Sequence, residues 1–281
     1  MQQKKIPTLL GLLLLVLAIA IFGYAFDRIE PLLSRASASA IPTNVMISNI
    51  SDVGFTVSWT TQVPTTGAIT VESDSIKHGV IYDERDATHT SLASEKSLGI
   101  YATHMATFRN ATPNTRYQIK ILSNSTKYQD IHGPYGIKSG PSLDGNGTGI
   151  EPAFGTVMTD TGQPAEGALL YLTLENAQTL STLIKSSGSW VIPLNLVREK
   201  SLTTYIIPTE RIDETLIIRS NVQESQALSD TLNDNPTPEI VLGNTYDFRK
   251  IQASIAKKGL ATAQPSVLGT TTSTTPIGVI A

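Results

Sequence analysis

The side chains that could carry chemistry are few and are scattered along the 281 residues. The histidines, His78, His89, His104 and His132, show no His-x-x-x-His or Glu-x-x-His spacing, the arrangement that places two metal ligands on one helix face. No cysteine is present, so thiol catalysis and cysteine metal sites are excluded. Nucleophile elbows, phosphate-binding loops and dinucleotide fingerprints are also missing. We therefore expect a protein that is not an enzyme, without catalytic residues, cofactor or metal.

One glycine-rich segment, residues 144–149, begins like a calcium loop. Asp144, Asn146 and Thr148 place side-chain oxygens at positions one, three and five, with glycine at position six. A loop of this kind closes with a bidentate Glu at position twelve, where this chain has Gly155. The segment is therefore interpreted as a linker turn rather than as a calcium site.

Tyrosine and asparagine side chains offer two further kinds of surface chemistry. Tyr101, Tyr128 and Tyr135 lie near expected loops, where exposed rings could form a platform for sugars; tyrosines at strand ends more often close the edge of a core. Several asparagines fit the Asn-x-Ser/Thr glycosylation pattern, which arises often by chance in a chain rich in Ser, Thr and Asn. These are Asn49, Asn110, Asn124 and Asn146.

The distribution of charge argues against nucleic acid as a partner. Residues 41–140 carry 8 acidic and 8 basic side chains, residues 153–248 carry 12 acidic and 5 basic, and residues 249–281 carry only four basic ones. Binding to phosphates needs a concentrated basic face, which none of the expected folded parts provides. The acidic second region could attract cations or the basic tail, although a solvated, self-repelling surface is the simpler interpretation.

The strongest positional signal lies at the amino terminus, where residues 1–26 are expected to form a cytoplasmic start and one transmembrane helix. Lys4 and Lys5 precede the uncharged apolar residues 6–26, which as a helix reach about 30 Å, enough to cross a bilayer. Because lysines prefer the cytoplasmic side, the rest of the chain is expected outside the cell membrane. The alternative is secretion after signal cleavage, but the apolar run exceeds a signal core and the nearest small-x-small site, residues 36–38, follows late.

Behind this segment the chain has room for two domains. Residues 27–42, rich in Ser, Ala and Pro, are typical of a short stalk. Over residues 43–139 apolar and polar residues alternate, as in Phe-Thr-Val-Ser-Trp-Thr at 55–60, the pattern of strands buried on one face. Turn signals recur between the expected strands, which indicates a β-sandwich, and a linker rich in Gly and Pro follows at 140–152. Without disulfides, an exported protein of this kind fits a bacterial surface better than a eukaryotic one.

Trp59 and Tyr117 have the order and spacing of an aromatic pair known from one sandwich family. Trp59 ends the second expected strand, and the run from Pro113 to Tyr117 reads Pro-Asn-Thr-Arg-Tyr. Residues 43–139 thereby resemble the fibronectin type III domain, with its buried tryptophan and its Pro-x-Thr-x-Tyr signature. The resemblance implies that Tyr117 forms a hydrogen-bonded corner. With His104 ahead of the turn, the region looks most like the non-catalytic leading domain of purple acid phosphatases, whose metal-binding motifs do not occur here as a set.

A second set of turn residues marks the region 153–248. Gly162 and Pro164 supply a tight turn, and Gly188 lets the chain reverse so that Trp190 can enter a core. Together with a Gly-x-Val start and alternating leucines, these residues resemble the carboxypeptidase regulatory-like, or prealbumin-like, domain. The resemblance implies a second β-sandwich.

The end of the second region and the tail are less regular. Residues 215–218 and 239–242 can supply closing strands, and the acidic, polar residues 223–238 between them are expected to form a long exposed connection. Residues 249–281 are expected to be a flexible tail. A short helix could start at Phe248, but the Thr-rich run that follows cannot bury enough surface to fold.

The expected fold class is all-β: two β-sandwich domains in series after an amino-terminal transmembrane helix, with a disordered tail. The expected function is that of a non-enzymatic, membrane-anchored cell-surface protein whose modules serve adhesion, spacing or recruitment of an extracellular polysaccharide or protein. Two alternatives stay open. One is an accessory, non-catalytic component of an exported hydrolase such as a metallophosphatase, and the other is a structural stalk or envelope subunit.

Overall fold

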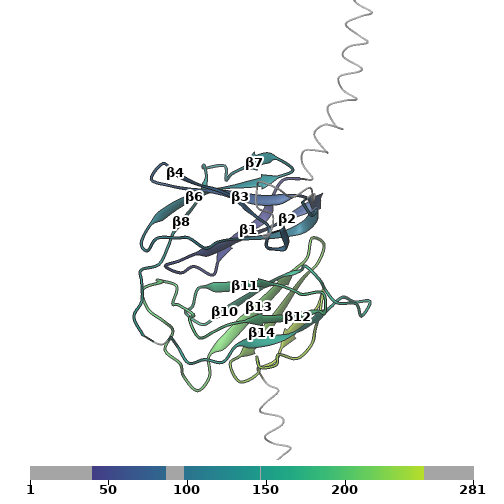
Figure 1. The fold of residues 1–281 in the computed structure, drawn as a ribbon. Helices are drawn as coiled ribbons and strands as arrows, with labels where there is room; N and C mark the ends of the chain where they lie inside the picture. Colours follow the sequence, from purple (N-terminus) through teal and green to yellow (C-terminus); the bar gives the residue numbers. More distant parts are fainter. Residues whose placement is uncertain (1–39, 87–97, 146, 250–281) are drawn as a thin grey trace, which may run out of the picture.

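The structure is a computed structural model that describes residues 40–86, 98–145 and 147–249 (Figure 1). The expected transmembrane helix, most of the expected stalk and almost all of the tail lie outside these residues. Within them the chain is all-β, as the alternating pattern predicts, with one short 3-10 turn, η1, at Glu84–Asp86. No helix in the described part is long and apolar enough to cross a membrane.

The strands are short and are joined by turns, as is usual for a β-sandwich. In chain order they are β1 Thr43–Ser48, β2 Phe55–Thr65, β3 Gly67–Ser73, β4 Ile76–Tyr82, β5 Tyr101–Phe108, β6 Arg116–Ser123, β7 Thr126–Tyr128, β8 Tyr135–Lys138, β9 Ala153–Met158, β10 Leu169–Leu174, β11 Thr179–Leu183, β12 Ser189–Ile192, β13 Asp213–Arg219, β14 Glu224–Asp230, β15 Ile240–Val241 and β16 Thr245–Asp247.

Strands β1 to β8 form the first β-sandwich. One sheet has the order β1-β2-β5 and the other the order β4-β3-β6-β7, with β8 also paired to β6. Phe55, Val57 and Trp59 are two residues apart on β2 and therefore share one face of their sheet. They meet Ile119 and Ile121 of β6 in a single buried cluster between the two sheets.

Trp59 and Tyr117 both lie inside this core. Trp59 is fully buried, and the Tyr117 hydroxyl accepts a hydrogen bond of 2.7 Å from the backbone N–H of Thr112. This bond closes the turn that contains Pro113 and Asn114. Asn114 has a φ of 58°, a left-handed conformation that asparagine tolerates well. The strand order and the tyrosine corner together make the domain a fibronectin-like β-sandwich.

Strands β9 to β16 form a second β-sandwich. Its sheets have the orders β11-β10-β13-β14-β16 and β12-β9-β15. Leu170, Leu172 and Leu174 alternate along β10 and enter the core that also contains Trp190 of β12. Gly155 stands opposite Trp190 on β9, and a Cβ at this position would lie 3.2 Å from the indole nitrogen. The glycine therefore leaves room for the ring.

Gly162 and Gly188 both occupy turns of the second sandwich. Their φ angles are 74° and 80°, in the region that favours glycine. Pro164 closes the first turn through a β-bridge to Met158. At Gly188 a Cβ would lie 2.9 Å from the backbone oxygen of Val157, so close approach as well as backbone angle requires glycine there.

The expectation of a long exposed connection over residues 223–238 is wrong. Glu224–Asp230 forms β14, which pairs with β13 on one side and with β16 on the other. Its buried inner positions are held by Ser225, Ala227 and Ser229. Because these residues are small and two of them are polar, the strand shows no hydrophobic alternation, and only its partners in the sheet reveal it.

The two sandwiches are stacked face to face, so the molecule has four sheet layers (Figure 1). Sheet β1-β2-β5 packs on the long sheet that contains β10 and β11, with Met105 between Leu169 and Tyr171. The period-two pattern of β2 predicts burial on one face only. In the structure its polar residues, such as Thr56 and Ser58, are buried as well. The second sandwich covers the face that carries them.

Candidate functional site

Three polar residues of the first sandwich have the arrangement of a hydrolase triad. His104 of β5 lies with Nδ1 3.4 Å from Asp83 Oδ2 and with Nε2 3.0 Å from the Thr65 hydroxyl. Acid, imidazole and hydroxyl in this order can activate a nucleophile. All three residues are completely buried, however, and Trp59 stacks on the imidazole with 4.9 Å between ring centroids. The Thr65 hydroxyl is closed to solvent, and the three side chains join neighbouring strands of the core.

The charge of Asp83 is maintained by its neighbours. Burial alone would raise the pKa of this carboxyl, but hydrogen bonds from His104 and Arg85 outweigh burial and lower the pKa to about 2. Arg85 Nε and Nη2 donate to the two carboxylate oxygens at 2.8 and 3.0 Å, and the Met105 N–H adds a bond of 3.1 Å. The ionised form therefore stabilises the fold fully above pH 3.8, and this contribution is lost as the pH falls towards 2.

The other histidines lie apart from this set. His78 of β4 shares a hydrogen bond of 2.7 Å with Ser73 and packs edge-on against Phe108. His132 is exposed in the loop before β8, and His89 lies outside the described residues. In the part of the chain that the structure describes, no three His, Asp or Glu side chains are grouped so that they could hold a metal ion.

The glycine-rich segment before the second sandwich packs against it. The Thr148 hydroxyl donates to the Leu194 carbonyl at 2.8 Å, and the Thr148 N–H donates to the Asn195 carbonyl at 2.7 Å. Gly147 has a φ of 82°, and a Cβ there would lie 2.1 Å from the same Asn195 oxygen. The Thr148 oxygen considered for calcium is therefore committed to the protein backbone, while Asp144 is exposed.

The three tyrosines considered for sugar binding do not form a common platform. Tyr128 of β7 and Tyr135 of β8 pack on the edge of the first core. Tyr101 lies where the two sandwiches meet, in a cleft of about 640 Å³ that Glu166 also lines. The Arg85 guanidinium lies 3.5 Å from the centroid of the Tyr101 ring and covers it. One face of this ring is therefore closed to stacking with a sugar.

The contact between the sandwiches, which we call the seam, combines the apolar cluster of Met105, Leu169 and Tyr171 with a set of hydrogen-bonded polar residues. Asn49 follows β1 and pairs with the backbone of Ser181 on β11: its Oδ1 accepts from the Ser181 N–H at 2.9 Å, and its Nδ2 donates to the Ser181 carbonyl at 3.0 Å. Gln178 does the same in the opposite direction, accepting from the Ile50 N–H and donating to the Ile50 carbonyl, both at 2.7 Å. We call these four residues the amide clasp. Each side-chain amide pairs with both the N–H and the carbonyl of one residue, as a neighbouring strand would.

Buried hydroxyl groups extend the amide clasp across the seam. The hydrogen bonds join Ser48 to Ser181, Ser58 to Tyr171 and Thr103 to the Gly167 carbonyl, at 2.6, 2.8 and 2.6 Å. At one edge Arg198 forms an ion pair of 2.6 Å with Asp52. Buried polar groups that are fully paired specify one arrangement of the surfaces that carry them. The paired polar groups therefore favour one arrangement of the two sandwiches.

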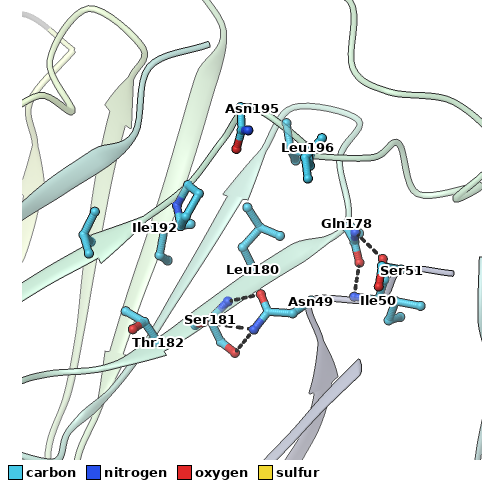
Figure 2. A pocket seen from close by; sticks show the side chains of 13 residues that line it. Asn49, Ile50, Ser51, Gln178, Leu180, Ser181, Thr182, Ile192, Asn195 and Leu196 are labelled. Carbon is cyan, nitrogen blue, oxygen red and sulfur yellow. Dashed lines mark hydrogen bonds between the residues drawn. The ribbon is translucent and has the colours of Figure 1, made fainter. Parts of the chain in front are cut away.

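A groove opens beside the amide clasp, where β11 and β12 meet the first sandwich (Figure 2). It has a volume of about 320 Å³. Leu180 and Ile192 are buried beneath it, whereas Val191 and Leu196 on its border are 41% and 56% exposed. The residues that line the groove are Asn49, Ile50, Ser51, Gln178, Leu180, Ser181, Thr182, Val191, Ile192, Pro193, Asn195, Leu196 and Val197.

The lining of the groove determines which ligands it can accept. None of the lining residues is charged, and none is aromatic. Aliphatic side chains offer apolar contact, while amides and hydroxyls can donate and accept hydrogen bonds. This lining suits an uncharged ligand with both apolar and hydrogen-bonding groups. It lacks the charge for a phosphate and the aromatic face for a sugar ring.

The sequence predicts residues of the two cores but not those of the seam. The family resemblances assign Trp59 and Trp190 to cores and a hydrogen-bonded corner to Tyr117; both tryptophans are buried, and the Tyr117 hydroxyl bonds the Thr112 N–H. Asn49 stands out in the sequence only as a glycosylation acceptor, but its amide nitrogen is engaged with Ser181 and Thr56. The signal that could have indicated the seam is the row of Ser and Thr on β2. Small hydroxyl side chains at every second position suit a face that another sheet covers.

No protein-family model matches the sequence, and no curated protein matches it. Among solved structures it is similar to a myokine structure, at 14% identity over 36% of this chain and 97% of that chain, with a TM-score of 0.24. The sensor domain of the anti-sigma factor RsgI4 of Pseudobacteroides cellulosolvens is similar at 16% identity, over 36% of this chain and 98% of the other, with a TM-score of 0.23. The FN1–FN3 domains of chicken CNTN1 are similar at 10% identity, over 73% of this chain and 67% of the other, with a TM-score of 0.23. At these values the similarities say nothing about what this chain binds.

Proposed function

We propose that the chain is a non-enzymatic surface protein whose two stacked sandwiches act as one rigid binding or spacer unit. The observation that carries the proposal is the seam, where the amide clasp pairs backbone groups of Ile50 and Ser181 with side chains of the other sandwich. Domains joined by a small polar contact usually move relative to each other. Here the paired polar groups and the apolar contact of Met105 with Tyr171 oppose such motion.

We place this unit outside the cell, tethered by residues 6–26. The apolar length of that segment and the two lysines ahead of it support a membrane anchor. The resemblances of the first sandwich to the leading domain of purple acid phosphatases, and of the second to carboxypeptidase regulatory-like domains, fit non-catalytic modules of exported proteins. A rigid unit would present its groove in one orientation, which lowers the entropy cost of binding.

As the ligand of the groove we propose an extended, uncharged polypeptide segment. Of the two strands that border the groove, β12 is the first strand of its sheet and has an edge without a strand partner in the described residues, whereas on the edge of β11 the backbone of Ser181 is already paired with Asn49. Extended peptides bind beside such edges through main-chain hydrogen bonds, with pockets for alternate side chains. The side-chain amide of Asn195 and the aliphatic surface of Leu196 provide both kinds of contact.

A binding screen with the purified full chain in detergent tests this assignment. An array of uncharged peptides and a glycan array are probed side by side, and the peptides retained are then titrated. Leu196→Arg places a charge on the border of the groove and should weaken peptide binding by about tenfold or more. The matched control is Ile131→Arg, at a position 92% exposed in the first sandwich and away from the groove, which should leave binding unchanged.

The other results of this screen are informative as well. Retention of glycans instead of peptides, lost in Leu196→Arg, would make the groove a polysaccharide site. Peptide binding that survives Leu196→Arg would move the site elsewhere. Hydrolysis of phosphate, peptide or glycoside substrates by the purified chain would end the non-enzymatic proposal. Protease added to intact cells should cleave within residues 43–248, and complete resistance of that region would overturn the external placement.

A further inference from the structure

The groove beside the amide clasp has one strand edge that can pair with a further strand. Just ahead of β12, the Gly188 carbonyl accepts a hydrogen bond of 2.8 Å from the Val157 N–H of β9. The next carbonyl, that of Ser189, faces the other way and accepts from the Lys185 N–H at 3.0 Å. Residues of an antiparallel pair alternate in this manner along the strand. The N–H and carbonyl of Val191 therefore point away from β9, towards the groove that Val191 lines.

The chain itself contains a segment that suits this uncharged groove. Residues 259–281 include no charged and no aromatic residue. Within them, residues 266–275 read Ser-Val-Leu-Gly-Thr-Thr-Thr-Ser-Thr-Thr, and we call them the docking segment. They lie between Pro265 and Pro276, so each of them has an N–H that can donate to a strand edge. Most of them are β-branched, which favours an extended backbone.

We infer that the docking segment of the same chain occupies the groove and pairs with the edge of β12 at Val191. This contact rests on the proposed function, since it names the polypeptide that the groove holds before any other peptide binds. A Thr-rich run cannot bury enough surface to fold alone, but the groove supplies a strand partner and the aliphatic surface of Leu196. An external peptide must then displace the docking segment, which thereby regulates the site.

The place where the tail leaves the second sandwich lies within reach of the groove. The pairing registers align one row of residues across the long sheet, from β16 to β11: Tyr246, Ala227, Leu216, Leu172 and Leu180. The last of these lines the groove. Four strand spacings of about 4.8 Å separate the ends of the row, a distance of about 19 Å. Residues 250–265 span about 50 Å when extended, which suffices for a path around the sandwich.

The charges of the linking residues favour contact within one molecule. Lys250, Lys257 and Lys258 are the charged residues of 250–265, whereas residues 153–248 carry 12 acidic and 5 basic side chains. Attraction between the two keeps the linking residues beside the second sandwich. A tether of this kind gives its end an effective concentration of the order of millimolar at a site within reach. A weak strand contact is sufficient at that concentration.

Disulfide cross-linking of the full chain in detergent tests the contact, because the sequence has no cysteine of its own. Leu196→Cys combined with Thr271→Cys places one thiol on the border of the groove and one in the docking segment. Under mild oxidation this pair should cross-link about fivefold faster than the control pair, Val222→Cys with Thr271→Cys. Val222 is 79% exposed between β13 and β14, nearer to β16 than the groove is, so a tail that is not docked would reach it at least as readily.

Peptide binding measures the regulation. Leu268→Arg places a charge in the docking segment and should raise the affinity of the full chain for the peptides retained on the array about fivefold, because the groove is then vacant. Thr262→Arg puts the same charge in the tail outside the docking segment and is the matched control, which should leave the affinity unchanged.

The two measurements separate this inference from the proposed function. Equal cross-linking rates for the two cysteine pairs would overturn the inference, and array peptides that still bind would leave the groove as a peptide site. A cross-linked product of twice the mass would assign the docking segment to a second copy and overturn the contact within one chain. An affinity unchanged by Leu268→Arg would overturn the regulation. Absence of peptide binding in the unmodified chain and in Leu268→Arg would contradict the proposed function, whereas fast cross-linking in the same preparation would support the contact with the tail.

Discussion

The side-chain amide of Gln178 forms two hydrogen bonds of 2.7 Å with the backbone of Ile50, which belongs to the other sandwich. The N–H and the carbonyl of Ile50 are both paired by this one side chain. Asn49 reciprocates by pairing with both backbone groups of Ser181. The amide clasp therefore joins two domains in the way that strands join within a sheet. This relationship makes the seam a determinant of stability as well as of shape.

Removal of the Gln178 amide should destabilise the protein markedly. In Gln178→Ala the N–H and carbonyl of Ile50 lose their partners in a partly buried position, and the expected loss in free energy of unfolding is about 2 kcal/mol. Urea unfolding followed by tryptophan fluorescence measures it. Gln118→Ala, at an exposed position of β6, is the control and should change stability by less than about 0.5 kcal/mol. Equal midpoints for the two variants would show that the amide clasp does not hold the seam.

Ser58 and Tyr171 should be energetically coupled across the seam. Their hydroxyls lie 2.8 Å apart and are buried. Ser58→Ala and Tyr171→Phe each remove one of the two hydroxyls and leave the other without this partner, and the double variant removes both. A double-mutant cycle of these two changes should give a coupling energy of about 1 kcal/mol. Additive effects of the two substitutions would mean that the sandwiches are not held together at this point in solution.

His104 should be a structural residue of the first core. Replacement by Ala removes the ring that stacks on Trp59 and takes one polar contact each from Asp83 and Thr65, which keep Arg85 and Ser123 as partners. We expect a loss of about 3 kcal/mol in free energy of unfolding, mainly from the cavity that the ring leaves in the core. The exposed His132→Ala is the matched control and should be nearly neutral. A urea midpoint unchanged by His104→Ala would contradict the buried network.

The stability of the protein should fall as the pH rises, because of Glu214 and Asp234. Burial is the main cause that raises their pKa values from 4.5 and 3.8 to about 9 and about 6. The folded state therefore holds protons that the unfolded chain releases, so the contribution is complete below pH 4 and declines as the pH approaches 9. Tm values across this range measure the decline. Glu214→Gln should flatten the curve, and a Tm that instead rises with pH would contradict the raised pKa values.

Gly147 should tolerate substitution much less well than Gly149. The two glycines have φ angles of 82° and 73°, so alanine is strained to a similar degree at both. Only at Gly147 would the new Cβ meet an atom, the Asn195 oxygen at 2.1 Å. Gly147→Ala should therefore lower the Tm by several degrees more than Gly149→Ala. Similar values for the two would mean that the segment does not pack closely on the second sandwich in solution.

The strands and cores could be predicted where the inward positions are large and apolar. The alternation over residues 55–60 indicates β2, and the leucines of β10 indicate a strand, because side chains of a strand point alternately to its two faces. The same reasoning fails for β14, whose inward residues are Ser225, Ala227 and Ser229. A hydrophobic pattern cannot report a strand whose buried side chains are small and partly polar.

The seam and the buried carboxyl groups of Glu214 and Asp234 could not be predicted from local patterns. Ile50 and Gln178 are separated by 128 positions in the chain, and nothing near either residue specifies the other. Glu214 shares the inward row of β13 with the apolar residues Leu216 and Ile218, so its burial follows from the strand pattern. Its neighbour Asp234, however, comes from a different segment of the chain. Such sites depend on which elements pack together.

The sequence by itself determined the all-β class, the absence of cysteine chemistry and the large apolar residues of β2 and β10 that enter the two cores. These properties follow from composition and from periodicity within one strand, which are local. Only the tertiary structure decided that the sandwiches stack face to face, that the polar side of β2 is covered, and that Asn49 and Gln178 close the contact. These depend on hydrogen bonds and packing between distant segments, which exist only once both sheets are formed.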